Sequence, residues 1–486
     1  MPDNQRQLRI AVIGAGASGI MALIKLGEAG YDEVVAFEKA GDLGGTWRDN
    51  RYPGLTCDVP SLAYRYSFAP NPDWSRVCAP GPEIHAYVRS VAERYGVESQ
   101  IRYDSEVTSA RFHDGRWSLE TVQGPQGDFD VVLTATGVLH HPVYPDIPGL
   151  ADFAGPAFHT ARWNHDVSLA GKRVGIIGTG STATQITGAI VGEVAHLSLF
   201  QRTPQWIMPG PNPEYTPEQH AEFHAHPELL EEEYQRLNDQ QGVNFADAVI
   251  GENPAVYEKM DFLCRQNLEN NVRDPELRRR LTPDYKVGCK RLIVSDNFYD
   301  AIQQPNAGLV TDAITGIEPG GVRTADGRLH ELDVLVLATG FNTHQFFRPM
   351  TVTGKGGFTL ESAWAARNQG YMSVTTPGFP NWFMIGGPNS PIGNFSWLVT
   401  AENQLGFAMK LMDRLRAGNA REIAPKPEAT AAYNDALNAK MKDTVWASGC
   451  RSWYIDGEGR VASWPWTYAT FLKNMAEPVL EDFEIA

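Results

Sequence analysis

The chain has 486 residues, of which 42% are hydrophobic and 21% charged, a balance that excludes a disordered, collagen-like or coiled-coil protein. Asp and Glu outnumber Lys and Arg by 58 to 42, giving a net charge of −16, so neither nucleic acid nor an anionic membrane surface is an expected partner. No apolar run is long enough for a membrane helix, and the first residues lack the order of a signal peptide. We therefore expect a cytoplasmic protein of roughly three domain-sized units.

The cysteines and histidines argue against metal and dithiol chemistry. The five cysteines are Cys57, Cys78, Cys264, Cys289 and Cys450. None are in C-x-x-C spacing, which predicts neither a disulfide scaffold nor a zinc site and disfavours a dithiol–disulfide reductase. His220 and His224 lie one helical turn apart in a polar segment, but no third ligand follows at the spacing of a zinc motif. No metal site is predicted.

The first glycine motif lies close to the N-terminus. A buried strand is predicted at 10–13, followed by Gly14, Gly16 and Gly19 in the pattern G-x-G-x-x-G. In this pattern the first glycine permits the turn, the second lets a pyrophosphate approach the backbone, and the third lets the helix pack on the strand. The next strand ends at Glu38, whose carboxylate is suited to ribose hydroxyls. These residues predict a dinucleotide site.

A second motif of the same kind occurs in the middle of the chain. A strand at 173–177 is followed by Gly178, Gly180 and Ala183. The position that corresponds to Glu38 in the first motif is Arg202. Because a guanidinium suits a 2′-phosphate, the second site is predicted to prefer NADPH.

Two further segments support a duplication. Residues 129–139 and 332–341 each contain an Asp, an apolar strand and Ala-Thr-Gly, and each is expected to close its nucleotide-binding unit. The predicted fold class is α/β with two dinucleotide-binding, Rossmann-like domains. Two such sites in one chain imply electron transfer between cofactors.

On these motifs the sequence resembles the class B flavoprotein monooxygenases. Shared features are the GAGASG and GTGSTA turns, the GGTW run at 44–47, the stretch RYPGLTCDVPS, both ATG strands and the QRTP run. The resemblance implies FAD in the first site, contacted by Gly45, Thr46 and Trp47, and NADPH in the second, near Ser181. It also implies an FAD domain at 1–150 and 335–486, with an NADPH domain at 151–334 inserted. A helical insertion is expected at about 211–284.

The segment before the second motif narrows the subfamily. Phe153, Gly155, His159 and Trp163 form F-x-G-x-x-x-H-x-x-x-W, which resembles the fingerprint of type I Baeyer-Villiger monooxygenases. Relatives that oxidise heteroatoms usually carry Tyr or Phe at the position of Trp163. The family pattern continues with Pro or Asp, whereas this chain has Asn164. The alternative is that His159 and Trp163 are ordinary packing residues.

The same resemblance assigns candidate catalytic residues. The run GCKRL contains Lys290 and Arg291, which correspond to a Lys near the NADPH phosphate and an Arg beside the flavin, with Asp58 orienting that Arg. An always-charged, planar Arg suits a site that must stabilise a peroxide anion and an oxyanion. Family members commonly carry Ala-Arg where this chain has Leu55-Thr56. The alternatives are a solvated Lys-Arg pair and a turn Asp.

Two C-terminal stretches complete the candidate residues. By resemblance, 386–404 passes the flavin and substrate pocket and includes Asn394 and Phe395, whereas 445–471 contains a loop that closes over NADP⁺ and includes Trp453. Clustered aromatics are equally compatible with a hydrophobic core.

The sequence therefore predicts an FAD- and NADPH-dependent Baeyer-Villiger monooxygenase. It would insert one atom of O₂ into a small-molecule ketone, through a flavin peroxide, to give an ester or lactone. Alternatives are a flavin monooxygenase that oxidises sulfur or nitrogen and, further away, an NADPH–flavin reductase that inserts no oxygen. The sequence distinguishes neither the ketone nor a monomer from a homo-oligomer.

Overall fold

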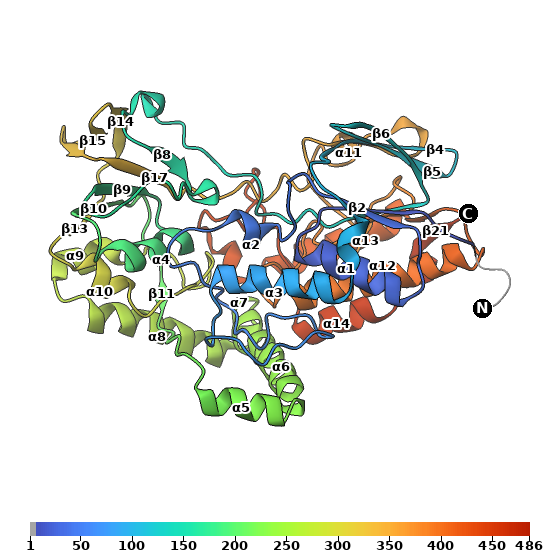
Figure 1. Ribbon diagram of the computed structural model, residues 1–486, viewed down its shortest axis with the longest axis horizontal. Coiled ribbons are helices and arrows are strands. Elements are labelled where there is room, and N and C mark those ends of the chain that lie inside the picture. Colours follow the sequence, from blue (N-terminus) through green and yellow to red (C-terminus); the bar gives the residue numbers. More distant parts are fainter. Residues whose placement is uncertain (1–5) are drawn as a thin grey trace.

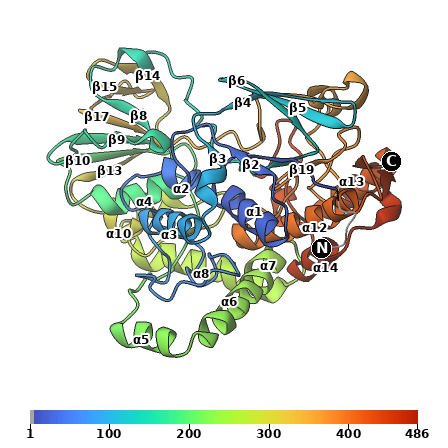
Figure 2. The same cartoon turned by 45° about the vertical axis from the view of Figure 1, so that its right-hand side comes forward.

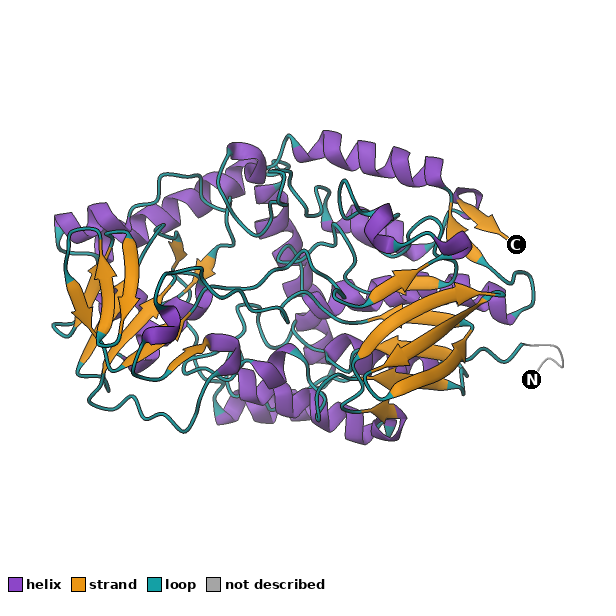
Figure 3. Ribbon diagram, turned by 90° about the horizontal axis from the view of Figure 1, so that it is seen from above, coloured by secondary structure: helices purple, strands orange, loops and turns teal. Residues whose placement is uncertain are grey.

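The computed structural model describes residues 6–486 and contains two parallel sheets, one at each end of the molecule (Figure 1). Figure 3 shows the strands gathered at the two ends, with helices and loops between them. Among the residues described, no helix is both long and apolar enough to cross a membrane.

The sheet of the first unit is parallel throughout. Its order is β19 (Trp382–Met384), β7 (Val131–Thr134), β1 (Ile10–Ile13), β2 (Val34–Phe37) and β3 (Ile101–Arg102). Helix α1 (Ala17–Glu28) packs on β1 and β2, and α3 (Gly81–Arg94) and α12 (Trp397–Arg416) pack against α1. Side chains alternate between the faces of β1: Ile10 and Val12 point to the helical core, whereas Ala11 and Ile13 join a second core.

That second core lies beneath a smaller sheet of order β18 (Thr351–Thr353), β4 (Val107–His113), β5 (Arg116–Thr121) and β6 (Gly124–Phe129). Trp117 and Trp382 are fully buried there, with ring centroids 4.8 Å apart. The indole of Trp117 donates to the Pro380 carbonyl over 2.7 Å. The C-terminal strand β19 is thus sandwiched with N-terminal elements, so the first unit is built from both ends of the chain.

The sheet of the second unit has the order β13 (Ala307–Val310), β10 (His196–Phe200), β9 (Arg173–Ile177), β17 (Val334–Leu337) and β8 (Ala157–His159). Helices α4 (Ser181–Ile190) and α10 (Phe298–Ile302) pack together, and the hairpins of β14 (Ile314–Glu318), β15 (Gly321–Thr324) and β16 (Leu329–Glu331) cover another core. The predicted boundary at residue 335 needs correction. It cuts through β17, which pairs with β8 and β9, so the first unit resumes only after residue 337.

The expected insertion is helical. It contains α5 (Pro217–Ala225), α6 (Glu228–Gln241), α7 (Asp247–Val249), α8 (Pro254–Asn271) and α9 (Pro275–Leu281), the first two at the bottom of Figure 2. It contacts the first unit as well as the second, because buried Arg65 donates to the Leu230 carbonyl over 2.9 Å and His220 contacts the Trp74 carbonyl over 3.0 Å. The insertion therefore holds the two units together.

The remaining elements are short or close the chain. They are α2 (Thr46–Asp49), β11 (Ile207–Met208), β12 (Ile293–Val294), α11 (Leu360–Ala363), β20 (Ile423–Pro425), α13 (Pro427–Met441), α14 (Tyr468–Ala476) and β21 (Phe483–Ile485).

The cysteines contradict the expectation that this chain lacks a paired dithiol. Cys289 and Cys450 form a disulfide although 161 residues separate them in sequence. Local spacing detects only pairs close in sequence, and the fold brings these two Cα atoms to 6.2 Å, within the range a disulfide needs. Cys57, Cys78 and Cys264 stay free.

Candidate active site

One cleft of about 1320 Å³ runs between the two units and is lined by both. The N-terminal turns of α1 and α4 both face it, through Gly14, Gly16 and Ser18 on one side and Gly178, Gly180 and Ser181 on the other. Neither helix has a side-chain cap. Backbone N–H groups without partners in a first helical turn attract phosphate groups, so each helix offers a site for a dinucleotide.

The glycines of the first unit are required by close contacts. Gly14 has φ +105°, and a Cβ there would lie 2.7 Å from the carbonyl oxygen of Ala135. A Cβ on Gly19 would lie 1.9 Å from the carbonyl oxygen of Gly14. Gly16 forms a backbone bridge to Gly44, and a Cβ on Gly16 would lie 3.6 Å from the Cα of Gly45, so the backbone itself lines a narrow cradle that a pyrophosphate can approach.

Glu38 stands at the end of β2 in the wall of this cradle. Only 4% of the residue is exposed, and its carboxylate accepts the Ala15 N–H over 2.8 Å and the Ala40 N–H over 3.0 Å. Arg48 pairs with it at 3.0 Å. Glu38 lines the cleft, and these bonds leave its Oε2 with one unused acceptor site, which fits the predicted contact with ribose hydroxyls.

Gly45, Thr46 and Trp47 face the cradle from the other side. They begin α2 and line the cleft. The Trp47 indole donates to the Tyr64 hydroxyl over 3.3 Å and packs edge-on against that ring. All three predicted residues therefore lie beside the first glycine cradle.

The second unit repeats the cradle with different charge. Gly178 has φ +117°, and a Cβ there would lie 2.2 Å from the carbonyl oxygen of Ala338. Arg202 and Lys290 line the cleft. Burial lowers the pKa of Lys290, and the nearby Arg202 cation lowers it further. The carboxylate of Asp284 opposes this shift only in part, and two neighbouring cations on the cleft wall suit a phosphate ligand.

Arg291 and Asp58 form the charged pair predicted by the resemblance. The Nη2 of Arg291 donates to Oδ1 and Oδ2 of Asp58 over 2.7 and 2.6 Å, and its Nε donates to Oδ2 over 3.1 Å. Although burial opposes the charge, the Asp58 carboxylate raises the pKa of Arg291. Both residues line the cleft, so a fixed positive charge faces the space between the units.

The fingerprint residues lie outside the cleft wall. The His159 imidazole is fully buried; its Nε2 contacts the Gly340 carbonyl at 3.1 Å and its Nδ1 accepts the Ala161 N–H at 3.1 Å. Burial lowers the pKa of His159, so the ring is neutral. Trp163 packs edge-on against Phe158, with centroids 5.0 Å apart. Through His159, this segment connects β8 to Gly340, which lies in the stretch of chain that returns from β17 to the first unit.

The three candidate residues from the C-terminal stretches differ in their position relative to the cleft. The Asn394 side chain is fully buried and bonded to Ser463 and to the Trp464 carbonyl, and it is not among the residues that line the cleft. Phe395 and Trp453 line the cleft.

Sequence reasoning missed several contacts, because they join residues far apart in the chain. Tyr52 donates to Gln185 of α4 over 3.0 Å, and Gln185 donates to the Thr56 carbonyl over 3.1 Å. These bonds bridge the two units beside the cleft. Thr56 is one of the departures from the family pattern, and its hydroxyl is a second acceptor for Gln185, at 3.2 Å.

No group of three or more potential metal ligands lies together within the described part of the chain. His224 instead contacts Asp73, at 2.7 Å.

Comparisons with known proteins agree with this geometry. Residues 7–216 match the family described as flavin-binding monooxygenase-like. An uncharacterised monooxygenase of Mycobacterium tuberculosis is 46% identical, covering 98% of this chain and 96% of that protein. A Baeyer-Villiger monooxygenase of Streptomyces coelicolor is 38% identical, covering 98% and 92%.

A solved structure is similar over its whole length. Cyclohexanone monooxygenase from Rhodococcus sp. Phi1, bound to NADP⁺, superposes with a TM-score of 0.88 at 32% identity, covering 99% of each chain. The shared fold, the two glycine cradles and the level of identity agree. The chain belongs to the type I Baeyer-Villiger monooxygenases, flavoprotein monooxygenases that use FAD and NADPH.

Proposed function

We propose that this enzyme inserts one atom of O₂ into a small-molecule ketone to give an ester or lactone, and that Arg291, oriented by Asp58, is its catalytic residue. The observation that carries the proposal is the multiply bonded Arg291–Asp58 pair, which lines the cleft to which both dinucleotide cradles open.

The residues of the two cradles fit the two cofactors. Gly14, Gly16 and Gly19 with the start of α1 would hold the FAD pyrophosphate, and Glu38 its ribose. On the other side, Gly178, Gly180 and Ser181 would hold the NADPH pyrophosphate. Arg202 and Lys290 would pair with its 2′-phosphate, which NADH lacks.

When bound and reduced by NADPH, FAD supplies the activation of O₂, a chemistry that no side chain provides. The chain contributes the charge that this chemistry needs. Attack on a ketone places negative charge on the carbonyl oxygen, and the Arg291 guanidinium is held where it can stabilise that charge. Asp58 keeps the guanidinium in one orientation, so little reorganisation is needed during the reaction.

Labelled oxygen tests the proposal. The holoenzyme would be given NADPH, ¹⁸O₂ and a panel of cyclic, linear and aryl ketones together with a sulfide. We expect one labelled oxygen in an ester or lactone product, formed together with NADP⁺. Labelled sulfoxide with no ester would indicate heteroatom oxidation, and NADPH consumption that yields only hydrogen peroxide would indicate an oxidase or reductase.

A further inference from the structure

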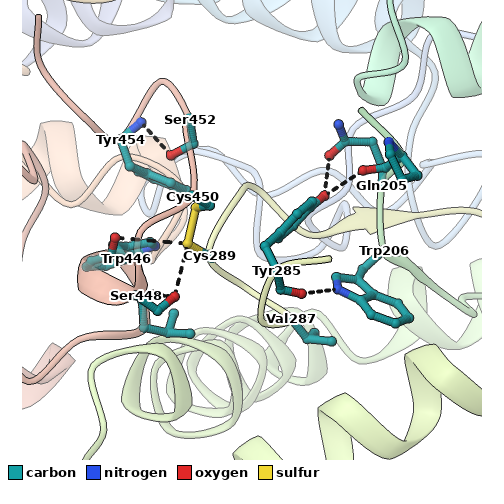
Figure 4. The surroundings of a disulfide bond; sticks show 12 residues. Gln205, Trp206, Tyr285, Val287, Cys289, Trp446, Ser448, Cys450, Ser452 and Tyr454 are labelled. Atoms are coloured by element: carbon teal, nitrogen blue, oxygen red, sulfur yellow. Dashed lines mark hydrogen bonds between the residues drawn. A yellow bond between two sulfur atoms is a disulfide. The ribbon is translucent and has the colours of Figure 1, made fainter. Parts of the chain in front are cut away.

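The Cys289–Cys450 disulfide adjoins the candidate catalytic residues in the sequence, and Figure 4 shows it close to Trp446, Ser448 and Tyr454. Cys289 is fully buried and immediately precedes Lys290 and Arg291. Cys450 is half-buried and begins the segment 450–455, which contains Trp453 and Tyr454. The bond thus joins the turn that presents Arg291 to a C-terminal segment that lines the cleft.

This C-terminal segment places a tyrosine against Arg291. Trp453 and Tyr454 stack with ring centroids 4.1 Å apart, and Tyr454 also packs on Trp446 at 5.1 Å. A Cβ added to Gly393 would lie 2.5 Å from Nη1 of Arg291 and 2.6 Å from the Tyr454 hydroxyl. Both groups therefore converge on Gly393, and the hydroxyl lies beside the guanidinium.

The Tyr454 hydroxyl is buried beside Arg291: burial raises the pKa of Tyr454, and the Arg291 cation opposes that rise. Tyr454 is 1% exposed, and its hydroxyl forms no hydrogen bond of good geometry with residues 6–486. A buried hydroxyl without a partner costs stability, so a contact with a charged group in the cleft would satisfy it. The guanidinium has Asp58 on its Nε and Nη2 atoms, while Nη1 faces the tyrosine.

Beside the disulfide, the Ser448 hydroxyl donates to Sγ of Cys289 over 3.3 Å. No backbone hydrogen bond joins Cys450 or Arg451 to any other residue in the described range. Further along, the Trp453 carbonyl contacts His344 at 3.1 Å, and the Tyr454 carbonyl accepts the Ala462 N–H at 2.7 Å. Apart from the continuous chain, the disulfide is thus the covalent link between the segment 450–455 and the turn at 289–291.

We propose that the Cys289–Cys450 disulfide and Tyr454 act together as a positioning device for Arg291. The bond fixes the segment 450–455 against the turn at 289–291, so that the tyrosine hydroxyl confronts the guanidinium on the side away from Asp58. Cleaving the disulfide frees the segment 450–455 from the turn at 289–291. The inference rests on the role proposed above for Arg291.

The redox step is ordinary thiol chemistry. A dithiol reductant breaks the S–S bond, leaves thiols on Cys289 and Cys450, and becomes a disulfide itself. In the reverse direction, the two thiols lose two protons and two electrons to hydrogen peroxide, which becomes water. Attack starts at Cys450, the half-exposed partner, because access controls exchange.

Peptide mapping and hydrogen exchange test the positioning role without relying on activity. The holoenzyme, purified without reductant, should yield a cross-linked peptide pair containing Cys289 and Cys450. After treatment with a dithiol, amide exchange should rise at 450–455 and at 286–292. The double variant Cys289→Ala/Cys450→Ala should show the raised exchange without reductant. The matched control Cys264→Ala, a free buried cysteine in α8, should behave as the wild type.

Kinetics then separate this proposal from the proposed function. Cleavage of the disulfide should lower kcat/KM for a ketone about tenfold while NADPH still reduces the flavin. Tyr454→Phe should lower kcat/KM in the same direction with hydrogen exchange unchanged. The positioning role would be overturned by five free thiols in the untreated enzyme, by hydrogen exchange that does not change on disulfide cleavage, or by a kcat/KM that neither disulfide cleavage nor Tyr454→Phe lowers. Loss of ketone oxygenation in the intact enzyme would instead overturn the proposed function and leave the exchange result standing.

Discussion

The first and second units are two versions of one cradle, and their differences show what each must hold. In both, a glycine at positive φ, Gly14 or Gly178, packs against the carbonyl oxygen of an alanine in an Ala-Thr-Gly turn, Ala135 or Ala338. In both, the following helix begins without a side-chain cap. The common frame supplies what any pyrophosphate needs, which is backbone N–H groups and space.

The units diverge in charge and enclosure at the end of the second strand. Glu38 is buried and bonded to two backbone N–H groups and to Arg48, whereas Arg202 is exposed. The first cradle is also closed from above by Gly44 and Gly45, while a Cβ on Gly180 would meet no atom within 4 Å. An enclosed site suits a cofactor that stays bound, and an open cationic site suits one that is exchanged in every cycle.

Replacing Arg291 should have the largest effect on turnover. It tests whether ketone oxygenation can be lost while both cradles still bind their cofactors. We expect Arg291→Ala to lower ketone oxygenation by about a hundredfold to a thousandfold. FAD content and NADPH-dependent flavin reduction should be retained, because neither cradle contains Arg291. Product formation and anaerobic reduction, measured on the same preparation, check this.

Arg291→Lys is the informative control. A lysine keeps the charge but cannot form the forked pair with Asp58, so it should restore only part of the rate. Oxygenation at the wild-type rate in the alanine variant would remove Arg291 from the mechanism.

The third position of the glycine motif, Gly19 in the first unit and Ala183 in the second, should respond differently to substitution in the two units. A Cβ on Gly19 would strike the Gly14 carbonyl, so Gly19→Ala should destabilise the protein by about 3 kcal/mol and reduce FAD content. The second unit already carries a buried alanine, Ala183, at this position, and Ala183→Gly should cost no more than about 1 kcal/mol. Thermal unfolding and flavin absorbance measure both; equal losses would contradict the difference in enclosure.

The cationic wall of the second unit should set coenzyme preference. Arg202→Ala removes a charged partner of the 2′-phosphate, which is expected to cost about 1.5–3 kcal/mol, or roughly tenfold to a hundredfold in NADPH affinity. NADH lacks this phosphate, so its KM should stay the same. Steady-state kinetics with both coenzymes check the prediction, and a parallel rise in both KM values would place Arg202 elsewhere.

The features that the sequence could predict are those whose residues lie close together along the chain. The strands at 10–13 and 173–177 and both glycine turns are local patterns, and the structure has them. The Asp58–Arg291 pair could be inferred only through resemblance, because nothing local links the two residues. The Cys289–Cys450 bond, the Tyr52–Gln185 bridge and the convergence of Tyr454 on Arg291 arise from tertiary packing, which spacing rules do not contain. The domain boundary at 335 was wrong for the same reason. The apolar sequence of β17 does not indicate which of the two sheets the strand joins, and the structure pairs it with β8 and β9.

The smallest expected effect is a pH dependence in the second unit. Burial and Arg202 lower the pKa of Lys290, so in the absence of coenzyme this side chain loses its proton at a lower pH than an ordinary lysine does. Only the protonated form attracts the 2′-phosphate, and NADPH affinity should therefore decline as the pH rises through that lowered pKa. Lys290→Arg keeps its charge over this range and should flatten the decline, whereas NADH should show none of it in either protein. The KM for both coenzymes across an alkaline pH series measures the effect. A profile that is the same in wild type and Lys290→Arg would assign the decline to another group and leave Arg202 as the sole phosphate partner.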